Sequence, residues 1–341
     1  MDSRERVIRA LELTGPDRLP VMHRTLPGAF IRYGRRLESL YEQYPSDVLL
    51  SPSLRAPFAH RDGVTEGSGH GTMLDAWGCV WQSSTDDYLG QVIGHPLADW
   101  RALDGYTFPD PAMGQEVRSE LIDAVGADHH RHYVLADAGS LYHRYTYLRG
   151  MEQGLIDVVE GSQEFQYVLE RIVAFSLERV AFWCQFDEVD GIQFSDDWGT
   201  QENLMISPKA WRRWFRPAYQ RIVDAIHAGG KYAHLHSDGQ ILSIIPDLIE
   251  IGWDEINPQV WAMDVEALSG LCAGTICVRA DLDRQWVLPF GAVADVEAHV
   301  RKTVATFHRP QGGYIGYGQV GPDVPLENAE AMLRTLYAGE Y

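Results

Sequence analysis

The fold-deciding segment reads GIQFSDDWG at residues 191–199, SPKAWRRWFRPAYQRIVDAIHAGG at 207–230 and KYAHLHSDG at 231–239. The outer two stretches have the length and composition of buried strands, and each ends at a glycine. The middle stretch begins with an N-capping serine and has a helical pattern. The order strand, helix, strand predicts a βαβ unit with two parallel strands in one sheet.

The same alternation continues through the C-terminal two-thirds of the chain. Strands are predicted at 132–139, 253–259, 275–283 and 312–319, with an early strand at 18–23 and helices at 150–184, 240–252, 264–274, 293–309 and from Pro325 onward. Five or more such units favour an α/β fold of the (β/α)8 TIM-barrel type. An open doubly wound sheet is the alternative, but no G-x-G-x-x-G follows any strand.

The region from about residue 52 to 115 departs from this alternation and is rich in Gly, Pro, Asp and Trp. We interpret it as a β-hairpin with loops, laid over one end of the barrel near the N-terminus. The prediction is therefore one barrel domain over residues 1–341 with a hairpin and loop insertion.

Composition excludes several classes of protein. The formal net charge is −19, which disfavours contact with nucleic acid or anionic membranes. There is no apolar run long enough to cross a membrane and no signal peptide at the N-terminus. The four cysteines form no C-x-x-C pair and do not suggest a disulfide framework. We expect a soluble cytoplasmic protein.

Polar residues collect where the predicted strands end, which is the active-site end of a (β/α)8 barrel. They are His23, Arg24, Asp137, Ser195, Asp196, Asp197, His236, Ser237, Asp238, Asn257, Gln259, Asp281, Asp283 and Gln319. One such residue means little, because loops are polar. The recurrence at successive strands predicts a functional pocket.

Two groups of residues within this ring suggest chemistry. His234, His236 and Asp238 alternate along one strand and would project to the same face. Such a group could bind zinc or another divalent ion. We expect His236 and Asp238 to lie in the pocket and His234 to lie deeper, as a hydrogen-bonded support beneath them. Asp196 and Asp197 are neighbours, so only one should enter the pocket. We expect Asp197 to do so, as a general base or a ligand contact.

The sequence resembles the uroporphyrinogen decarboxylase superfamily, which includes the decarboxylase and corrinoid-linked methyltransferases. The resemblance rests on SRERVIRALELTGPDRLPV, on DDWGTQENLMISPKAWRRWFRPAYQRIVDAIHAGGK, and on HSDGQILSIIPDLIEIGWDEINPQ and GGYIGYGQVGPDVPLENAEAM. It implies a (β/α)8 barrel, an enzyme and a homodimer.

At several motif positions the sequence differs from the members of this superfamily. The methyltransferase branch holds zinc with His-x-Cys and a distant Cys. Here the histidine matches His236, but Asp238 stands at the first Cys position and Gln319 at or near the second. The resemblance therefore leaves His236 and Asp238 as candidate metal ligands, without the usual cysteines. The decarboxylase branch carries R-Q-A-G-R after its first strand, and here only Arg24 of that motif is in place.

Three functions stay open. The first is a methyltransferase acting on a small methylated substrate, with a corrinoid protein or folate as partner and Asp197, His236 and Asp238 positioning the transferred group. The second is a cofactor-free decarboxylase, in which Asp137 or Asp197 stabilises a protonated intermediate and Arg24 or Arg149 holds a carboxylate. The third is a non-catalytic binding protein on a decayed barrel.

The first function is favoured by the number of relatives with that role. The candidate substrate-binding residues are His23, Arg24, Tyr147, Arg149, Asn257, Gln259, Asp283 and Gln319.

Overall fold

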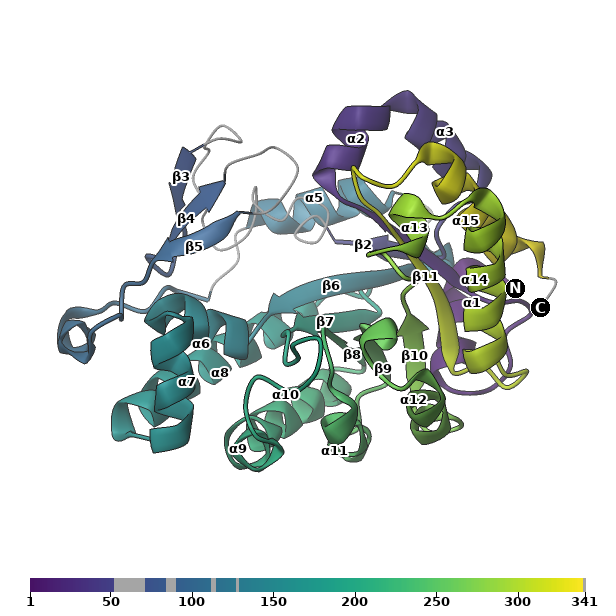
Figure 1. The fold of residues 1–341 in the computed structure, drawn as a ribbon. Helices are drawn as coiled ribbons and strands as arrows, with labels where there is room; N and C mark the ends of the chain where they lie inside the picture. The colour runs from purple at the N-terminus through teal and green to yellow at the C-terminus, as the bar shows by residue number, and fades with distance from the viewer. Residues whose placement is uncertain (52–70, 84–89, 112–114, 127–128, 340–341) are drawn as a thin grey trace.

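The protein is described by a computed structural model that covers residues 1–51, 71–83, 90–111, 115–126 and 129–339. Within these residues, eight parallel strands form the main sheet (Figure 1). They are β1 (Val21–Thr25), β2 (Val48–Leu50), β6 (Tyr133–Gly139), β7 (Gly191–Ser195), β8 (Tyr232–Ser237), β9 (Glu255–Pro258), β10 (Cys277–Ala280) and β11 (Tyr314–Val320). The predicted (β/α)8 barrel is confirmed.

The strand order is β1-β11-β10-β9-β8-β7-β6-β2, so sequence neighbours from β6 onward are also neighbours in space. The ends of this order, β1 and β2, are linked by a backbone hydrogen bond from Asp47 N to Val21 O, 2.8 Å long. This bond nearly closes the barrel at its N-terminal end.

Helices surround the sheet, and α8, α10, α14 and α15 contact strands directly (Figure 1). The α-helices are α1 (Ser3–Leu11), α2 (Pro27–Tyr33), α3 (Arg35–Gln43), α5 (Gln115–Val125), α6 (Tyr142–Arg149), α7 (Met151–Glu160), α8 (Gln163–Trp183), α9 (Pro208–Trp214), α10 (Arg216–Ala228), α11 (Ile245–Ile251), α12 (Val265–Cys272), α13 (Val287–Phe290), α14 (Val293–Phe307) and α15 (Leu326–Ala338). Short 3₁₀ turns are η1 (Trp100–Gly105), η2 (His129–Arg131), η3 (Leu242–Ile244) and η4 (Val260–Ala262). None of these helices is long and apolar enough to span a membrane.

Two helices expected to be continuous are broken. The expected helix at 150–184 divides at Gly161, which has φ of +64°, and Ser162 then caps α8 by accepting a hydrogen bond from Phe165 N. The expected helix at 207–230 divides at Phe215, because Pro217 lacks the N–H that would continue the α9 ladder. The first strand was placed three residues too early, since it begins only after Pro20.

The expected hairpin is a three-stranded antiparallel sheet of β3 (Gly71–Leu74), β4 (Val80–Ser83) and β5 (Gln91–Gly94). Asp75 joins it to the barrel, because its Oδ2 accepts a hydrogen bond from Arg144 Nη1 of α6 at 2.7 Å. The parts of this region at 52–70 and 84–89 lie outside the described residues.

The N-terminal end of the barrel is closed by α1 and a buried carboxylate. Val7 and Leu11 of α1 pack in one apolar cluster with side chains of the strands. Next to them, the fully buried Asp47 accepts hydrogen bonds from Arg6 Nη1 at 2.7 Å and from both terminal nitrogens of Arg18 at 2.9 Å. This carboxylate ties α1 to β1 and β2.

Replacing Asp47 with alanine should lower the free energy of unfolding by about 3–5 kcal/mol, because it removes the buried partner that Arg6, Arg18 and Val21 N share. Urea denaturation measures the change. The control is Asp17→Ala, since Asp17 also pairs with Arg6 but is 39% exposed. That control should cost only about 1 kcal/mol. Equal losses in the two variants would contradict the assigned role of Asp47.

Candidate functional site

Three side chains with ligand atoms meet where β7 and β8 end. Asp197 follows β7, His236 lies on β8 and Asp238 follows β8. One ligand atom of each lies within 4.8 Å of the others. His236 Nε2 is 3.7 Å from Asp197 Oδ1 and 3.6 Å from Asp238 Oδ1. Imidazole and carboxylate groups are common ligands of divalent cations, so these three residues, here called the ligand trio, form a candidate metal site.

Asn257 on β9 fixes the state of the His236 ring. His236 Nδ1 lies 2.9 Å from Asn257 Oδ1 and 3.0 Å from Asn257 O. Both atoms are acceptors, so Nδ1 carries a proton and any lone pair of the ring lies on Nε2. The amide of Asn257 is itself oriented, because Nδ2 donates to Arg279 O at 2.6 Å. The lone pair therefore faces the two carboxylates, ready to bind a cation or accept a proton.

The adjacent carboxylates Asp196 and Asp197 have different roles in the fold. Asp196 is fully buried and accepts hydrogen bonds from Leu141 N and His143 N at 2.8 Å and from Tyr219 Oη at 2.5 Å. These bonds attach the first turn of α6 to the end of β7. Asp197 instead belongs to the ligand trio.

Asp197 lies between two imidazoles. Its Oδ2 is 3.4 Å from His143 Nε2, its Oδ1 faces His236, and Oδ1 also accepts a hydrogen bond from Asp238 N at 2.9 Å. Burial alone would raise the pKa of Asp197, but His143, His236 and the Asp238 N–H hold that pKa below its usual value. Asp197 is therefore a carboxylate, not a carboxylic acid, at neutral pH.

Arg284 adds a positive charge to the trio. Its Nη2 donates to Asp238 Oδ1, and its Nη1 donates to Gln319 Oε1 at 2.6 Å. On its other side, Nε lies 3.9 Å from Oδ2 of the buried Asp281. Burial raises the pKa of Asp281 to about 7, while Arg284 acts in the opposite direction.

A second, buried polar layer lies deeper in the barrel. His234 Nδ1 is 2.7 Å from Glu255 Oε2, and its Nε2 is 2.6 Å from Tyr133 Oη. Glu255 Oε1 in turn lies 3.1 Å from Arg279 Nε, and Arg279 Nη2 donates to Gln193 Oε1 at 2.6 Å. Both ring nitrogens of His234 are thus occupied by protein groups, so His234 supports the site from below.

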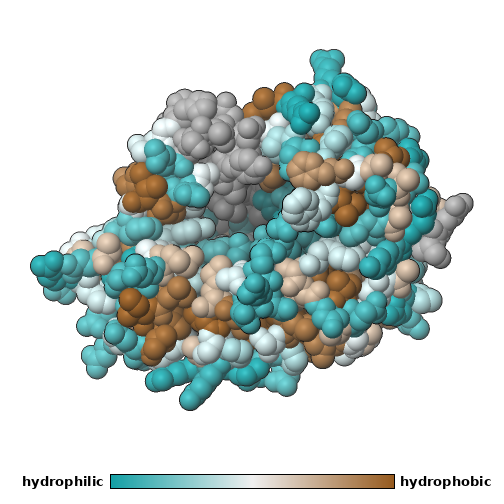
Figure 2. Space-filling view, viewed as in Figure 1, coloured by the Kyte–Doolittle hydropathy of each residue, from teal (hydrophilic) through white to brown (hydrophobic). Residues whose placement is uncertain are grey.

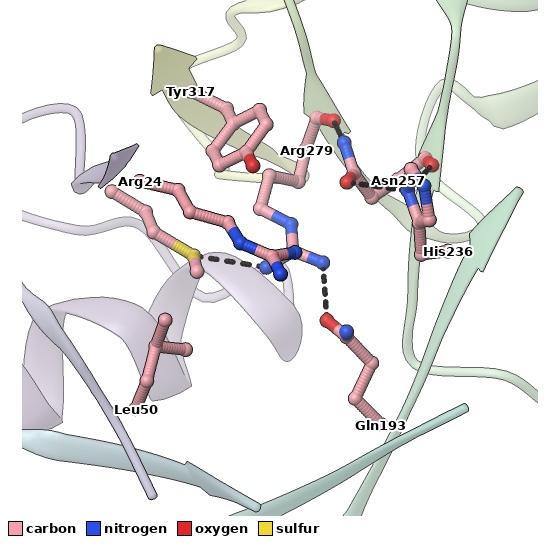
Figure 3. A pocket seen from close by; sticks show the side chains of 8 residues that line it. Arg24, Leu50, Gln193, His236, Asn257, Arg279 and Tyr317 are labelled. Carbon is pink, nitrogen blue, oxygen red and sulfur yellow. Dashed lines mark hydrogen bonds between the residues drawn. The ribbon is translucent and has the colours of Figure 1, made fainter. Parts of the chain in front are cut away.

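A pocket opens above this layer, in the hollow at the mouth of the barrel (Figures 2 and 3). Its lining residues are Met22, Arg24, Leu50, Gln193, His236, Asn257, Arg279 and Tyr317. Arg24 and Arg279 both extend into it (Figure 3). Among the described residues, Arg24 has no hydrogen-bond or ion-pair partner, whereas Arg279 is paired with Glu255. The pocket therefore joins His236 of the trio to a guanidinium that is free to bind an anion.

A family model for uroporphyrinogen decarboxylase matches residues 2–338 of this sequence. The chain belongs to the uroporphyrinogen decarboxylase family. Members of this family are enzymes, decarboxylases or methyltransferases, and the present chain is a uroporphyrinogen decarboxylase-like enzyme.

Two solved structures align with most of this chain, and the first of them agrees with the fold of the uroporphyrinogen decarboxylase family. A methyltransferase from Methanosarcina mazei superposes with a TM-score of 0.70 over 98% of both chains, at 14% sequence identity. A type I 3-dehydroquinate dehydratase from Clostridium difficile aligns over 94% of both chains with 9% identity and a TM-score of 0.40. Identity at this level supports the shared fold alone. A search of curated proteins finds no significant match.

Two of the expected substrate contacts of this uroporphyrinogen decarboxylase-like enzyme point elsewhere. His23 faces away from the pocket, and its Nε2 lies 2.9 Å from Tyr44 O, because successive residues of β1 alternate between the two faces. Arg149 is 3% exposed and pairs with Asp157 at 2.7 Å, while its Nη1 donates to Leu97 O. It fastens α6 to α7 and to the segment before η1.

Other expected residues lie around the site without lining the pocket. Asp137 Oδ1 accepts a hydrogen bond from Gly139 N at the irregular end of β6. Tyr147 stacks on the His143 ring, with centroids 5.7 Å apart. Gln259 Oε1 accepts from Gly239 N at 3.0 Å and so braces the loop after β8.

Asp283 and Gln319 also act through other residues. Asp283 Oδ1 accepts hydrogen bonds from Gln285 N and Trp286 N and shapes the turn before α13. Gln319 holds the Arg284 guanidinium, as described above. Of the expected substrate-binding residues, the pocket is lined by Arg24 and Asn257.

Sequence reasoning missed seven residues of the site: Gln193, Arg279, Tyr317, Met22 and Leu50 in the pocket, and His143 and Arg284 beside the trio. The first three sit on strands at inward-facing positions, so strict alternation along β7, β10 and β11 would have found them. Arg284 follows the strand-end residues Asp281 and Asp283 closely, which was a usable signal.

His23 should make stability depend on pH. Burial lowers its pKa to about 4, against a typical unfolded value near 6.5. Between these two pKa values the folded state binds fewer protons than the unfolded state. The contribution of neutral His23 to the free energy of unfolding is therefore complete above pH 6.5 and is lost as the pH falls towards 4. His23→Gln keeps a donor for Tyr44 O but cannot titrate. When the pH falls from 7 to 4.5, its free energy of unfolding should therefore decrease by about 2 kcal/mol less than that of the wild type. Urea denaturation at both pH values checks this, and parallel losses would contradict it.

Proposed function

We propose that this enzyme is a methyltransferase that acts on a small methylated substrate with an anionic group, at a site that holds a divalent cation. The observation that carries the proposal is the oriented His236 ring, whose Nε2 faces Asp197 and Asp238 beside a pocket that contains Arg24, a side chain without a partner among the described residues. The solved methyltransferase from Methanosarcina mazei has the same fold, which is compatible with this assignment.

The donor set decides whether a metal fits. Asp197, His236 and Asp238 would hold the cation with one nitrogen and two carboxylate oxygens, a combination suited to zinc or a harder divalent ion. The two thiolates expected in the zinc-containing methyltransferases are replaced by Asp238 and Gln319. When bound, the cation would polarise the substrate group that carries the methyl and stabilise the negative charge left on it when the methyl departs.

Protein side chains would bind and orient the substrate beside the cation. Arg24 would pair with the anionic group of the substrate and orient it in the pocket. Met22, Leu50 and Tyr317 supply an apolar wall against which a methyl group can pack. Asp197, kept ionised by its neighbours, would supply a negatively charged ligand oxygen to the cation.

The methyl acceptor is proposed to be a corrinoid on a partner protein or a folate. A cofactor-free decarboxylase is the second candidate function, because the guanidiniums of Arg24 and Arg279 line one pocket and would suit a substrate carboxylate. Membership of an enzyme family favours both candidates over a non-catalytic scaffold.

Two measurements test the proposed function. Equilibrium dialysis against Zn²⁺ or Co²⁺ should show one cation bound to the wild-type chain and much weaker binding to Asp238→Ala. Methylcobalamin mixed with the protein and a panel of small anionic acceptors, or cob(I)alamin with methyl donors, should show the cobalamin absorbance change of methyl transfer. Release of CO₂ from a carboxylated substrate without any cobalamin change would favour the decarboxylase instead.

Arg24→Ala should raise the KM for an anionic substrate by about 100-fold, with a smaller change in kcat, since it removes a charge-assisted contact worth roughly 2–3 kcal/mol. Steady-state kinetics with the substrate found in the cobalamin assay measures this. Arg36→Ala, on the exposed side of α3, is the control of equal charge and should behave as wild type. An unchanged KM in Arg24→Ala would exclude Arg24 from substrate binding.

A further inference from the structure

We propose that Arg284 is a built-in competitor of the metal cation, and that it sets the cation affinity of the ligand trio. The inference rests on the metal site of the proposed function, and it assigns to Arg284 a role that the trio's own geometry does not require. Arg284 lies on the segment between β10 and α13 and reaches back across the site to Asp238.

The contact is with a metal-facing atom. Arg284 Nη2 donates to Asp238 Oδ1, and this same oxygen lies 3.6 Å from His236 Nε2. The guanidinium therefore neutralises the oxygen that a cation shared with His236 would use. A cation that uses Oδ1 of Asp238 must share that oxygen with Arg284 or displace the arginine from it.

The guanidinium is held in place by further groups. Gln319 Oε1 accepts from Nη1 at 2.6 Å, and Asp281 Oδ2 lies 3.9 Å from Nε. The side chain of Arg284 is only 26% exposed. An arginine guanidinium stays protonated throughout the physiological pH range, so the charge is permanent. Arg284 is thus a fixed positive charge rather than a mobile surface group.

A fixed positive charge next to a cation site must weaken it. Two like charges a few ångströms apart repel appreciably in a partly buried environment, and a divalent ion feels twice the effect of a monovalent one. Displacing the arginine would also break its charge-assisted bond to Asp238. By either route the net affinity falls, so the site should exchange its cation readily and the protein should lose metal during purification.

The test is a comparison of cation affinities that needs no substrate. Co²⁺ and Zn²⁺ dissociation constants are measured by competition with a chromophoric chelator for wild type, Arg284→Gln and Arg284→Lys. We expect Arg284→Gln to bind at least 10-fold more tightly than wild type. Arg284→Lys keeps the charge and should stay within about threefold of wild type. Arg301→Gln removes an exposed charge that pairs with Glu297 and should leave the affinity unchanged.

Each outcome has one meaning. Unchanged or weaker binding by Arg284→Gln, with wild type binding normally, overturns the competitor role and makes Arg284 a supporting residue of Asp238. No binding by wild type or by any variant overturns the metal site of the proposed function instead. If Arg284→Gln does not fold, Gln319→Ala loosens the guanidinium without removing it, and tighter binding by that variant supports the role while unchanged or weaker binding overturns it.

Discussion

His236→Ala should abolish measurable cation binding and lower the rate of methyl transfer by about 1000-fold or more, which is the range expected for loss of a metal ligand or general base. The ring supplies the single nitrogen donor of the trio. Its Nδ1 contacts with Asn257 direct Nε2 at Asp197 and Asp238. Chelator competition and cobalamin absorbance measure the two effects separately.

The matched control is His234→Gln, two residues earlier on the same strand. Both ring nitrogens of His234 are occupied, by Glu255 and by Tyr133, so this variant should lose roughly 1–3 kcal/mol of stability. Its cation affinity should stay within about threefold of wild type. Wild-type cation binding by His236→Ala, or complete loss in His234→Gln, would contradict the division of roles between the two histidines.

The two histidines illustrate what the sequence could and could not predict. The alternation in KYAHLHSDG correctly places His234 and His236 on one face of β8 and Asp238 just beyond the strand. It does not say how deep each lies. Depth follows from the register of β8 with β9, which pairs His234 with the buried Glu255 and His236 with Asn257. Such register is a property of the whole barrel.

The arginines show a different limit. Arg24 and Arg149 were equal candidates for a substrate carboxylate. Arg24 lines the pocket and has no side-chain partner in the part of the chain that the structure describes, whereas Arg149 pairs with Asp157. That pairing depends on the break between α6 and α7 at Gly150, which brings a residue eight positions later back alongside Arg149. A break in a helical pattern is poorly specified by local propensity.

Residues outside the strands were hardest to place. His143 sits in the first turn of α6 and reaches Asp197 because Asp196 binds its backbone N–H. Arg284 reaches Asp238 from a loop 46 residues later in the chain. Neither position obeys a period of two or of 3.6 residues. Both depend on loop paths that only the assembled barrel defines.

Gly239→Ala should weaken cation binding by about 100-fold or more and lower the stability by roughly 2–4 kcal/mol. Gly239 has φ of +80°, and a Cβ there would lie 2.2 Å from the carbonyl carbon and oxygen of Gly199. These are backbone atoms of the loop after β7 and cannot rotate away. The close approach allows Gly199 N to bond Asp238 O at 3.1 Å and Asp238 N to bond Asp197 Oδ1. Separating the loops would therefore pull apart two members of the trio.

Gly230→Ala separates this effect from simple backbone strain. Gly230 has φ of +71°, close to that of Gly239, but a Cβ there would meet nothing within 4 Å. It should cost only the roughly 1–2 kcal/mol of a left-handed alanine and leave the cation affinity unchanged. Chelator competition and urea denaturation of both variants make the comparison. If Gly239→Ala binds the cation as well as Gly230→Ala does, the trio does not depend on the contact between the two loops, and the cation must then be held by His236 and one carboxylate alone.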